Sequence, residues 1–171
     1  MKLEGVKGRD FRPTTQMVKG AILDSLYGEV QGGSFLDLFA GSGGVGIEAL
    51  SRGAESAVFV EKRGNAAGII KSNIERCGTG PENIRIVKGD AVDFLKNSAE
   101  SREEFTVIFA DPPYSAGLDE KIMGIICSLN YRICRILIIE SSRELEIPPG
   151  VSGVRQRIRN YGQTYVNYFR F

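Results

Sequence analysis

The residues best suited to chemistry are Asp111, Pro112, Pro113 and Tyr114, which follow the apolar run 105–110. Proline lacks a backbone N–H and cannot continue a central strand, so we expect the chain to leave the sheet here. The Asp111 carboxylate and a backbone carbonyl held by the prolines can each accept one hydrogen of a planar amine, which concentrates the lone pair on its nitrogen. Tyr114 offers a flat face on which a base can stack, an interaction of about 1–3 kcal/mol. The motif therefore predicts a reaction at an exocyclic amino group of a nucleobase.

A second candidate site is the glycine-rich segment 37–46, which contains Gly41, Gly43 and Gly46. Glycine lets the backbone approach a ligand closely, and the start of the following helix offers free N–H groups. The spacing matches the dinucleotide-binding pattern, but a tight turn without a ligand has the same spacing. The glycines alone therefore leave the choice of cofactor open.

Three acidic residues narrow that choice, because Asp37, Glu61 and Asp90 each lie at or near the end of an expected strand. Glu61 can accept hydrogen bonds from both ribose hydroxyls of either NAD or S-adenosylmethionine. Asp37 suits a methionine ammonium and is poorly placed beside a pyrophosphate, and Asp90 suits the amino group of adenine. Together the acids favour S-adenosylmethionine, bound in the crevice at the carboxyl ends of the strands.

The elements that must position these residues alternate between short apolar runs and amphipathic segments. This alternation predicts a mostly parallel α/β sheet of the Rossmann-like type, closed by an antiparallel hairpin. We expect one domain over 1–171, with a basic arm and helix in 1–30 and the Rossmann-like core in 34–171. The expected strands are 34–40, 57–60, 84–87, 105–110 and 135–140, the expected helices are 14–27, 45–52, 65–76, 92–96 and 118–128, and the hairpin strands are 154–161 and 164–171.

Composition excludes several kinds of site. The 171 residues include no His, and the three Cys form no Cys-x-x-Cys pair, so we expect no imidazole catalysis, no redox pair and no metal. No apolar run approaches the roughly 20 residues that cross a bilayer, and the first residues lack the apolar stretch of a signal peptide. We expect a cytoplasmic protein without membrane contact, and nothing in the sequence demands more than a monomer.

The distribution of charge is more informative than the formal net charge of +1. Basic residues outnumber acidic ones in both 1–20 and 151–171, whereas the middle of the chain is acidic. If the ends meet, they form a positive face suited to phosphates; scattered surface charge is the alternative. Arg155, Arg157 and Arg159 alternate onto one face of the expected hairpin, where they either position RNA or protect an exposed edge strand.

These motifs together resemble a known family. The segment 111–114 is similar to the signature of methyltransferases that act on amino groups of adenine or guanine. Four further segments resemble the RsmD-type 16S ribosomal RNA guanine-N2 methyltransferases, namely 12–15 (Arg-Pro-Thr-Thr), 39–43 (Phe-Ala-Gly-Ser-Gly), 59–62 (Phe-Val-Glu-Lys) and 161–164 (Tyr-Gly-x-Thr). The resemblance extends from about Arg12 onward. The short N-terminal arm, and Met17 where arginine is usual, depart from the family pattern and remove potential RNA contacts.

The resemblance implies a Rossmann-like fold, S-adenosylmethionine as methyl donor, and a flipped guanine of the small-subunit ribosomal RNA as acceptor. It implies that the base is held by Asp111, Pro112, Pro113 and Tyr114. The cofactor-binding residues that we predict are Asp37, Phe39, Ala40, Gly41, Ser42, Gly43, Glu61, Lys62, Asp90 and Ala91. The RNA-binding residues that we predict are Arg9, Arg12, Thr14, Arg155 and Arg157.

Three alternatives stay open. An N6-adenine DNA methyltransferase shares the Asp-Pro-Pro-Tyr chemistry, but it usually needs an added target-recognition domain for which this chain has no room. A non-catalytic subunit that binds S-adenosylmethionine and RNA is suggested by the short arm, but it has no need of Asp111 and Tyr114. An NAD-dependent oxidoreductase rests on the glycine pattern alone, because the chain lacks a recognisable hydride-transfer acid.

Overall fold

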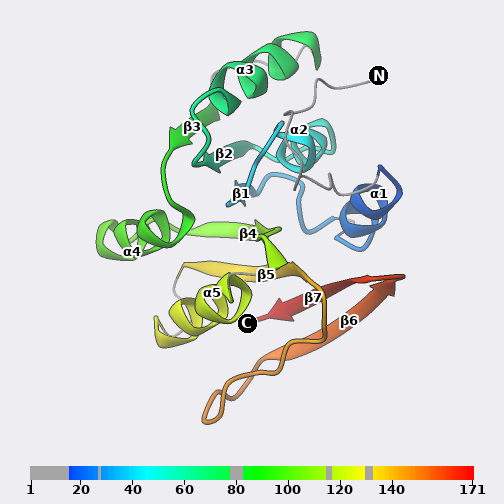
Figure 1. Cartoon of the computed structure of the whole chain (residues 1–171), viewed down its shortest axis with the longest axis vertical. Coiled ribbons are helices and arrows are strands. Elements are labelled where there is room, and N and C mark those ends of the chain that lie inside the picture. The colour runs from blue at the N-terminus through cyan, green and yellow to red at the C-terminus, as the bar shows by residue number, and fades with distance from the viewer. Residues whose placement is uncertain (1–15, 27, 78–82, 115–116, 130–132) are drawn as a thin grey trace.

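The computed structural model describes residues 16–26, 28–77, 83–114, 117–129 and 133–171. In this part of the chain seven strands form one sheet in the order β3-β2-β1-β4-β5-β7-β6 (Figure 1). The strands are β1 (Ser34–Asp37), β2 (Ser56–Glu61), β3 (Ile84–Lys88), β4 (Phe105–Ala110), β5 (Cys134–Ser141), β6 (Arg155–Tyr161) and β7 (Thr164–Arg170).

Strand direction confirms the predicted α/β architecture. The first five strands pair in parallel, with Leu36 opposite Val58 on one side and Ile108 on the other. Strand β7 runs antiparallel to both β5 and β6, so the predicted closing hairpin is also confirmed. From β1 the chain proceeds outward through β2 to β3, and then returns to β4 on the other side of β1. The carboxyl ends of β1 and β4 therefore border the crevice in which open α/β sheets bind ligands.

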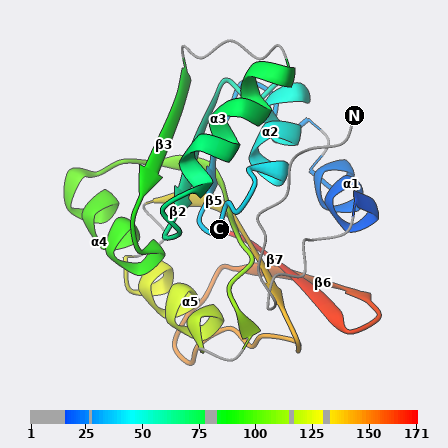
Figure 2. The ribbon, with the colours of Figure 1, turned by 45° about the horizontal axis from the view of Figure 1, so that its top comes forward.

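Helices cover both faces of the sheet (Figures 1 and 2). Buried side chains of α1 (Gln16–Asp24), α2 (Gly44–Ser51) and α3 (Ala66–Cys77) pack against one face. Those of α4 (Ala91–Ser101) and α5 (Leu118–Ser128) pack against the other, where Leu95, Ile122 and Ile126 contact the inward side chains of β1, β4 and β5. Buried strands alternate along the chain with helices that each bury one face. This alternation is why the sequence pattern indicated a layered arrangement.

Three element boundaries differ from the sequence prediction by three or more residues, and one of them is the end of α1 at Asp24 and not at about residue 27. Strand β1 ends at Asp37 and not at residue 40, although beyond its end the Leu38 N–H still donates to Phe109 O and the Ala40 N–H to Val60 O. Helix α4 continues to Ser101 and ends where Arg102 adopts a left-handed conformation with φ of 56°. The predicted start of the first helix at Thr14 or Thr15 lies outside the described residues. None of the described helices is long and apolar enough to span a membrane.

Candidate active site

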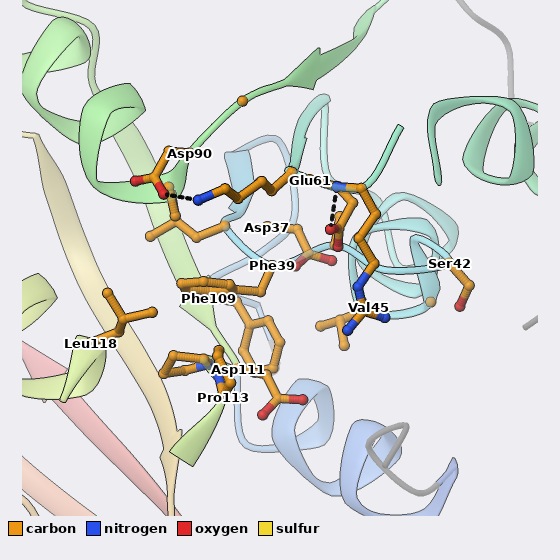
Figure 3. A pocket seen from close by; sticks show the side chains of 18 of the residues that line it. Asp37, Phe39, Ser42, Val45, Glu61, Asp90, Phe109, Asp111, Pro113 and Leu118 are labelled. Atoms are coloured by element: carbon orange, nitrogen blue, oxygen red, sulfur yellow. Dashed lines mark hydrogen bonds and ion pairs between the residues drawn. The ribbon is translucent and has the colours of Figure 1, made fainter. Parts of the chain in front are cut away.

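A cavity of about 690 Å³ lies at the carboxyl ends of the parallel strands (Figure 3). This volume is within the usual range for small-molecule sites. The cavity brings together residues from both predicted halves of the site. Its lining includes Asp37, Phe39, Ala40, Ser42, Glu61, Lys62, Asp90, Ala91, Asp111, Pro112, Pro113 and Tyr114.

Gly41 and Gly43 shape the turn between β1 and α2 and are not among the residues that line the cavity. Gly41 has φ of 54° and Gly43 has φ of 81°, in the left-handed region that favours glycine. The Gly41 N–H donates to Glu61 Oε2 at 2.9 Å, which ties the turn to the end of β2. Both glycines therefore hold the backbone of the predicted cofactor loop in shape.

Two contacts from outside the turn fix its position. A Cβ on Gly46 would lie 2.4 Å from Phe59 Cε1, so glycine is required for α2 to pack this closely on β2. On α3, the buried Asn73 donates from Nδ2 to the Ser42 carbonyl at 3.0 Å. Asn73 was not predicted from the sequence, because a contact across 31 residues leaves no local signal.

The carboxyl of Asp37 is buried in the wall of the cavity, and its pKa is strongly raised. Its side chain is 2% exposed, and its Oδ2 accepts the Gly46 N–H at 3.3 Å. Among the described residues, Oδ1 has no hydrogen-bond partner. Burial raises the pKa of Asp37 to about 7, against the opposing effects of the Gly46 hydrogen bond and the nearby Lys19 charge, and the charges of Asp111 and Glu61 add to the increase. Such a carboxyl favours a cationic ligand that would restore its charge.

Glu61 and Asp90 already have partners within the chain. Glu61 Oε1 accepts the Arg63 N–H at 2.9 Å, in addition to the Gly41 contact of Oε2. Asp90 caps α4, because its Oδ1 accepts the Val92 N–H at 2.9 Å, and its Oδ2 lies 3.3 Å from Lys62 Nζ. Burial raises the pKa of Asp90, but these hydrogen bonds outweigh burial and leave the pKa below its usual value. A ligand that contacts either acid therefore shares it with backbone N–H groups.

The segment after β4 forms the opposite side of the cavity. Pro112 is buried, whereas Pro113 and Tyr114 are exposed, so the chain leaves the sheet where the prolines predicted. The exposed fraction of Tyr114 is 47%, which leaves its ring accessible to a stacking partner. The Tyr114 hydroxyl lies 3.4 Å from Thr164 Oγ1 at the start of β7.

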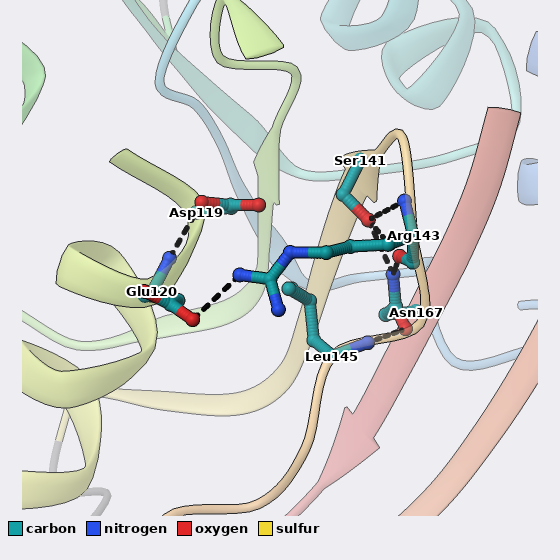
Figure 4. Close-up of polar contacts among 6 residues, drawn as sticks. All are labelled: Asp119, Glu120, Ser141, Arg143, Leu145 and Asn167. Carbon is teal, nitrogen blue, oxygen red and sulfur yellow. Dashed lines mark hydrogen bonds and ion pairs between the residues drawn. The ribbon is translucent and has the colours of Figure 1, made fainter. Parts of the chain in front are cut away.

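The loop after β5 is anchored to β7 and to the first turn of α5 (Figure 4). Asn167 is fully buried; its Oδ1 accepts the Leu145 N–H at 2.9 Å and its Nδ2 donates to Ser141 Oγ at 3.0 Å. Farther along the loop, Arg143 pairs with Glu120 in the first turn of α5 at 2.5 Å. Helix α5 follows the Asp-Pro-Pro-Tyr segment in the chain, so β5 and β7 help to fix the wall on that side.

Several further lining residues were not individually predicted to bind the cofactor or the base. They come from α1, from the glycine turn, and from the ends of strands or starts of helices, where their apolar or generic types carry no motif. They are Lys19, Leu38, Gly44, Val45, Arg63, Gly89, Phe109 and Leu118. Within the described residues, no group of three or more Cys, Asp or Glu side chains is arranged to hold a metal ion.

The cavity lining does not include Arg155 or Arg157, the two predicted RNA-binding residues that the structure describes. Arg155 and Arg157 are exposed on β6, the edge strand, opposite Arg170 and Tyr168 of β7. Tyr168 packs in the cluster that contains α1, so these arginines point from the same face of the sheet as that helix. Arg9, Arg12 and Thr14 lie outside the described residues, so a continuous positive face formed by both ends of the chain stays a prediction.

Comparison with known proteins identifies the family. The family model described as Conserved hypothetical protein 95 matches residues 1–170. YlbH of Bacillus subtilis (strain 168), which has a provisional name as an rRNA methyltransferase, is 35% identical over 173 residues that cover 98% of this chain and 92% of that protein. Ribosomal RNA small subunit methyltransferase D of Escherichia coli (strain K12) is 32% identical over 139 residues, which are 81% of this chain and 68% of that protein. The chain belongs to the RsmD family.

Solved structures agree with this membership of the RsmD family. The Escherichia coli protein yhhF, provisionally described as a methyltransferase, superposes with a TM-score of 0.81 at 26% identity, over 99% of this chain and 91% of that one. The Thermus thermophilus protein TTHA0928 superposes with a TM-score of 0.78 at 28% identity, over 98% and 92% of the two chains. The predicted Rossmann-like methyltransferase fold is therefore confirmed over nearly the whole chain.

Proposed function

We propose that this protein transfers a methyl group from S-adenosylmethionine to the exocyclic N2 amine of a guanine in small-subunit ribosomal RNA. The observation that carries the proposal is that one cavity joins the buried Asp37 and the turn after β1 to the Asp-Pro-Pro-Tyr segment after β4. The cofactor and the reaction class rest on this site and on the RsmD family. The ribosomal RNA substrate rests on the names of the relatives, and the guanine N2 atom rests on the family resemblance together with the amine chemistry of residues 111–114.

The chemistry of the lining fits S-adenosylmethionine. Asp37 presents a buried oxygen without a hydrogen-bond partner among the described residues, which suits the ammonium of the amino-acid end. Glu61 ends β2 at the usual position of a ribose-binding acid, and Asp90 lies at the start of α4 beside Ala91, near the predicted adenine. When bound, the cofactor supplies an activated methyl group on a sulfonium cation, and the acids around the cavity favour this positive charge.

At the reacting end, the chain's residues position an amine and localise its lone pair. Asp111 accepts one amine hydrogen and the Pro112 carbonyl accepts the other, while the prolines restrict φ and hold that carbonyl in place. Tyr114 stacks on the base and keeps it in the plane that these two acceptors require. Catalysis is then mainly orientation and electrostatic stabilisation, and no strong base is needed because the amine loses its proton after it has gained the methyl group.

RNA contacts are proposed for the basic residues outside the cavity. Arg155 and Arg157 bind phosphates from the edge strand, and Arg9, Arg12 and Thr14 contact RNA or cofactor from the N-terminal segment. The enzyme acts as a monomer in the cytoplasm without a metal. The RNA contacts of Arg155 and Arg157 are inferred from their charge and exposure on the hairpin. Those of the N-terminal residues are inferred from the family resemblance.

A methyl-transfer assay with three acceptors tests the proposal. Labelled S-adenosylmethionine is offered with small ribosomal subunits, with naked small-subunit RNA and with duplex DNA. We expect transfer to one of the ribosomal substrates, its loss in Asp111→Ala, and its retention in the control Asp93→Ala, which changes an exposed acid outside the cavity lining. Transfer to DNA alone would favour the adenine methyltransferase, and cofactor binding without any transfer would favour the non-catalytic subunit.

A further inference from the structure

The cavity has a basic residue at the same end as Asp37. Lys19 lies on α1, whose Val18 and Ile22 are buried against the sheet, and its own side chain is half-buried and lines the cavity. Its charge acts on Asp37, since it lowers the pKa of that carboxyl against the effect of burial. Two opposite charges from α1 and β1 therefore face the same part of the cavity.

The other basic residues of the lining come from a different segment of the chain. In the described part of the chain these are Lys62 and Arg63, which directly follow β2, and Lys62 pairs with Asp90 at 3.3 Å. Lys19 is the basic residue whose charge acts on the buried Asp37. A ligand with an ammonium next to a carboxylate matches this pair, because each of its charges meets an opposite charge.

We propose that Lys19 binds the carboxylate of the amino-acid end of S-adenosylmethionine while Asp37 binds its ammonium. This inference rests on the proposed function and extends it by assigning to α1 a direct role in cofactor recognition. Lys19 then serves two states of the protein: it offsets the buried Asp37 charge before the cofactor binds, and it pairs with the cofactor carboxylate afterwards.

The test compares S-adenosylmethionine with its decarboxylated analogue, which keeps the ammonium and the sulfonium and lacks only the carboxylate. Lys19→Met keeps most of the apolar stem and removes the charge. Calorimetric titration is carried out above the pKa of Asp37, so that this carboxyl is ionised in every variant that retains it. We expect Lys19→Met to weaken S-adenosylmethionine binding by at least about tenfold and to leave binding of the decarboxylated analogue within about twofold.

Three further variants make the result specific. Lys19→Arg should restore most of the affinity, because it retains the positive charge. Asp37→Asn should weaken binding of both ligands, since both carry the ammonium. Lys71→Ala, which changes an exposed residue of α3 outside the cavity lining, should leave both affinities unchanged.

If Lys19→Met loses the same affinity for both ligands, the proposal is overturned, and Lys19 acts only indirectly, through Asp37. Unchanged affinity for both ligands with a raised KM for RNA would also overturn it and place Lys19 on the substrate side. If the wild-type protein binds neither ligand, the proposed function itself fails. Near-ultraviolet circular dichroism and thermal unfolding confirm that each variant is folded before its affinity is compared.

Discussion

The Tyr114 hydroxyl and Thr164 Oγ1 lie 3.4 Å apart, which joins two segments separated by 50 residues. One segment ends the Asp-Pro-Pro-Tyr motif and the other begins β7 after the turn of the closing hairpin. The contact connects the proposed base-binding side of the cavity to the hairpin that carries Arg155 and Arg157. The hairpin therefore has a direct structural link to the position where the base is proposed to stack.

This contact allows the two roles of Tyr114 to be separated. Tyr114→Phe removes the hydroxyl and keeps the ring, so we expect kcat/KM to fall only a few-fold. Tyr114→Ala removes the stacking face, and the loss of about 1–3 kcal/mol predicts a decrease of roughly 5-fold to 150-fold. Steady-state methyl transfer to ribosomal substrate measures both. A Tyr114→Phe variant as impaired as Tyr114→Ala would show that the Thr164 contact matters more than stacking.

Asp37 predicts a pH dependence of cofactor binding. Its pKa is about 7 in the folded protein and 3.8 ordinarily, and the ammonium of the cofactor requires the ionised form. The affinity for the cofactor should therefore rise by up to tenfold per pH unit below about pH 7 and level off above it. Near neutral pH, cofactor binding should release a proton from Asp37. Titration calorimetry in buffers of different ionisation enthalpy measures both effects. Affinity that does not change between about pH 5 and about pH 8 would contradict this role of Asp37.

The same carboxyl affects the stability of the ligand-free protein with the opposite sign. Between pH 3.8 and about 7 the folded state holds a proton that the unfolded state has released, so this group makes stability fall as pH rises through that window. Asp37→Asn removes the effect, and we expect its melting temperature to exceed that of the wild type above the window but not below it. Thermal unfolding at several pH values measures this; parallel pH profiles of the two proteins would rule the effect out.

The close packing of Gly46 on Phe59 predicts that substitution of this glycine destabilises the fold, and Gly68 provides a matched control. A Cβ at this position would lie 2.4 Å from Phe59 Cε1, so Gly46→Ala should destabilise the fold by about 1–3 kcal/mol. A Cβ on Gly68 in α3 would meet no atom within 4 Å, so Gly68→Ala should stabilise by about 0.4–1 kcal/mol. Chemical denaturation measures both free energies of unfolding, and effects of the same sign would contradict the packing argument.

Asn167 predicts a defect in the loop after β5. Asn167→Ala leaves the Leu145 N–H without its acceptor, and a buried unpaired donor costs about 1–3 kcal/mol. Asn97→Ala changes an exposed residue of α4 and should have little effect. Denaturation compares the two, and hydrogen exchange at Leu145 should accelerate in Asn167→Ala. A normal exchange rate at Leu145 would mean that the loop does not depend on this side chain.

Arg157 predicts a change in the salt dependence of RNA binding. Arg157→Glu should weaken binding and reduce the slope of log affinity against log salt by about 0.7–0.9 for each phosphate that the protein no longer neutralises. Arg135→Glu makes the same charge change at the start of β5, the end of the sheet away from the cavity, and should alter the slope less. A salt titration by fluorescence anisotropy measures both. Identical slopes for the two variants would mean that Arg157 only protects the edge strand.

The chemistry of the site was readable from sequence where it depends on residue types at short spacing. Gly41, Gly43 and Gly46 satisfy backbone geometry or close packing within one turn, and residues 111–114 combine an acid, a strand break and an aromatic ring. Strand and helix types followed from the alternation of apolar runs, because each layer of the fold buries one kind of pattern.

Other parts of the site depend on contacts between distant residues and leave no local signal. Asn73 reaches the glycine turn from α3, Asn167 fixes a loop from β7, and Lys19 enters the cavity from α1. The end of β1 at Asp37 likewise left no local signal, because the apolar run continues to residue 40.

Analysis of the methylated nucleoside tests the central claim most directly. Small ribosomal subunits from cells that lack the protein are incubated with the purified enzyme and S-adenosylmethionine, and their RNA is digested and examined by mass spectrometry. The proposed function predicts N2-methylguanosine in the small-subunit RNA, absent when Asp111→Ala replaces the wild type. A methylated adenosine, or no methylated nucleoside from a protein that binds the cofactor, would contradict it.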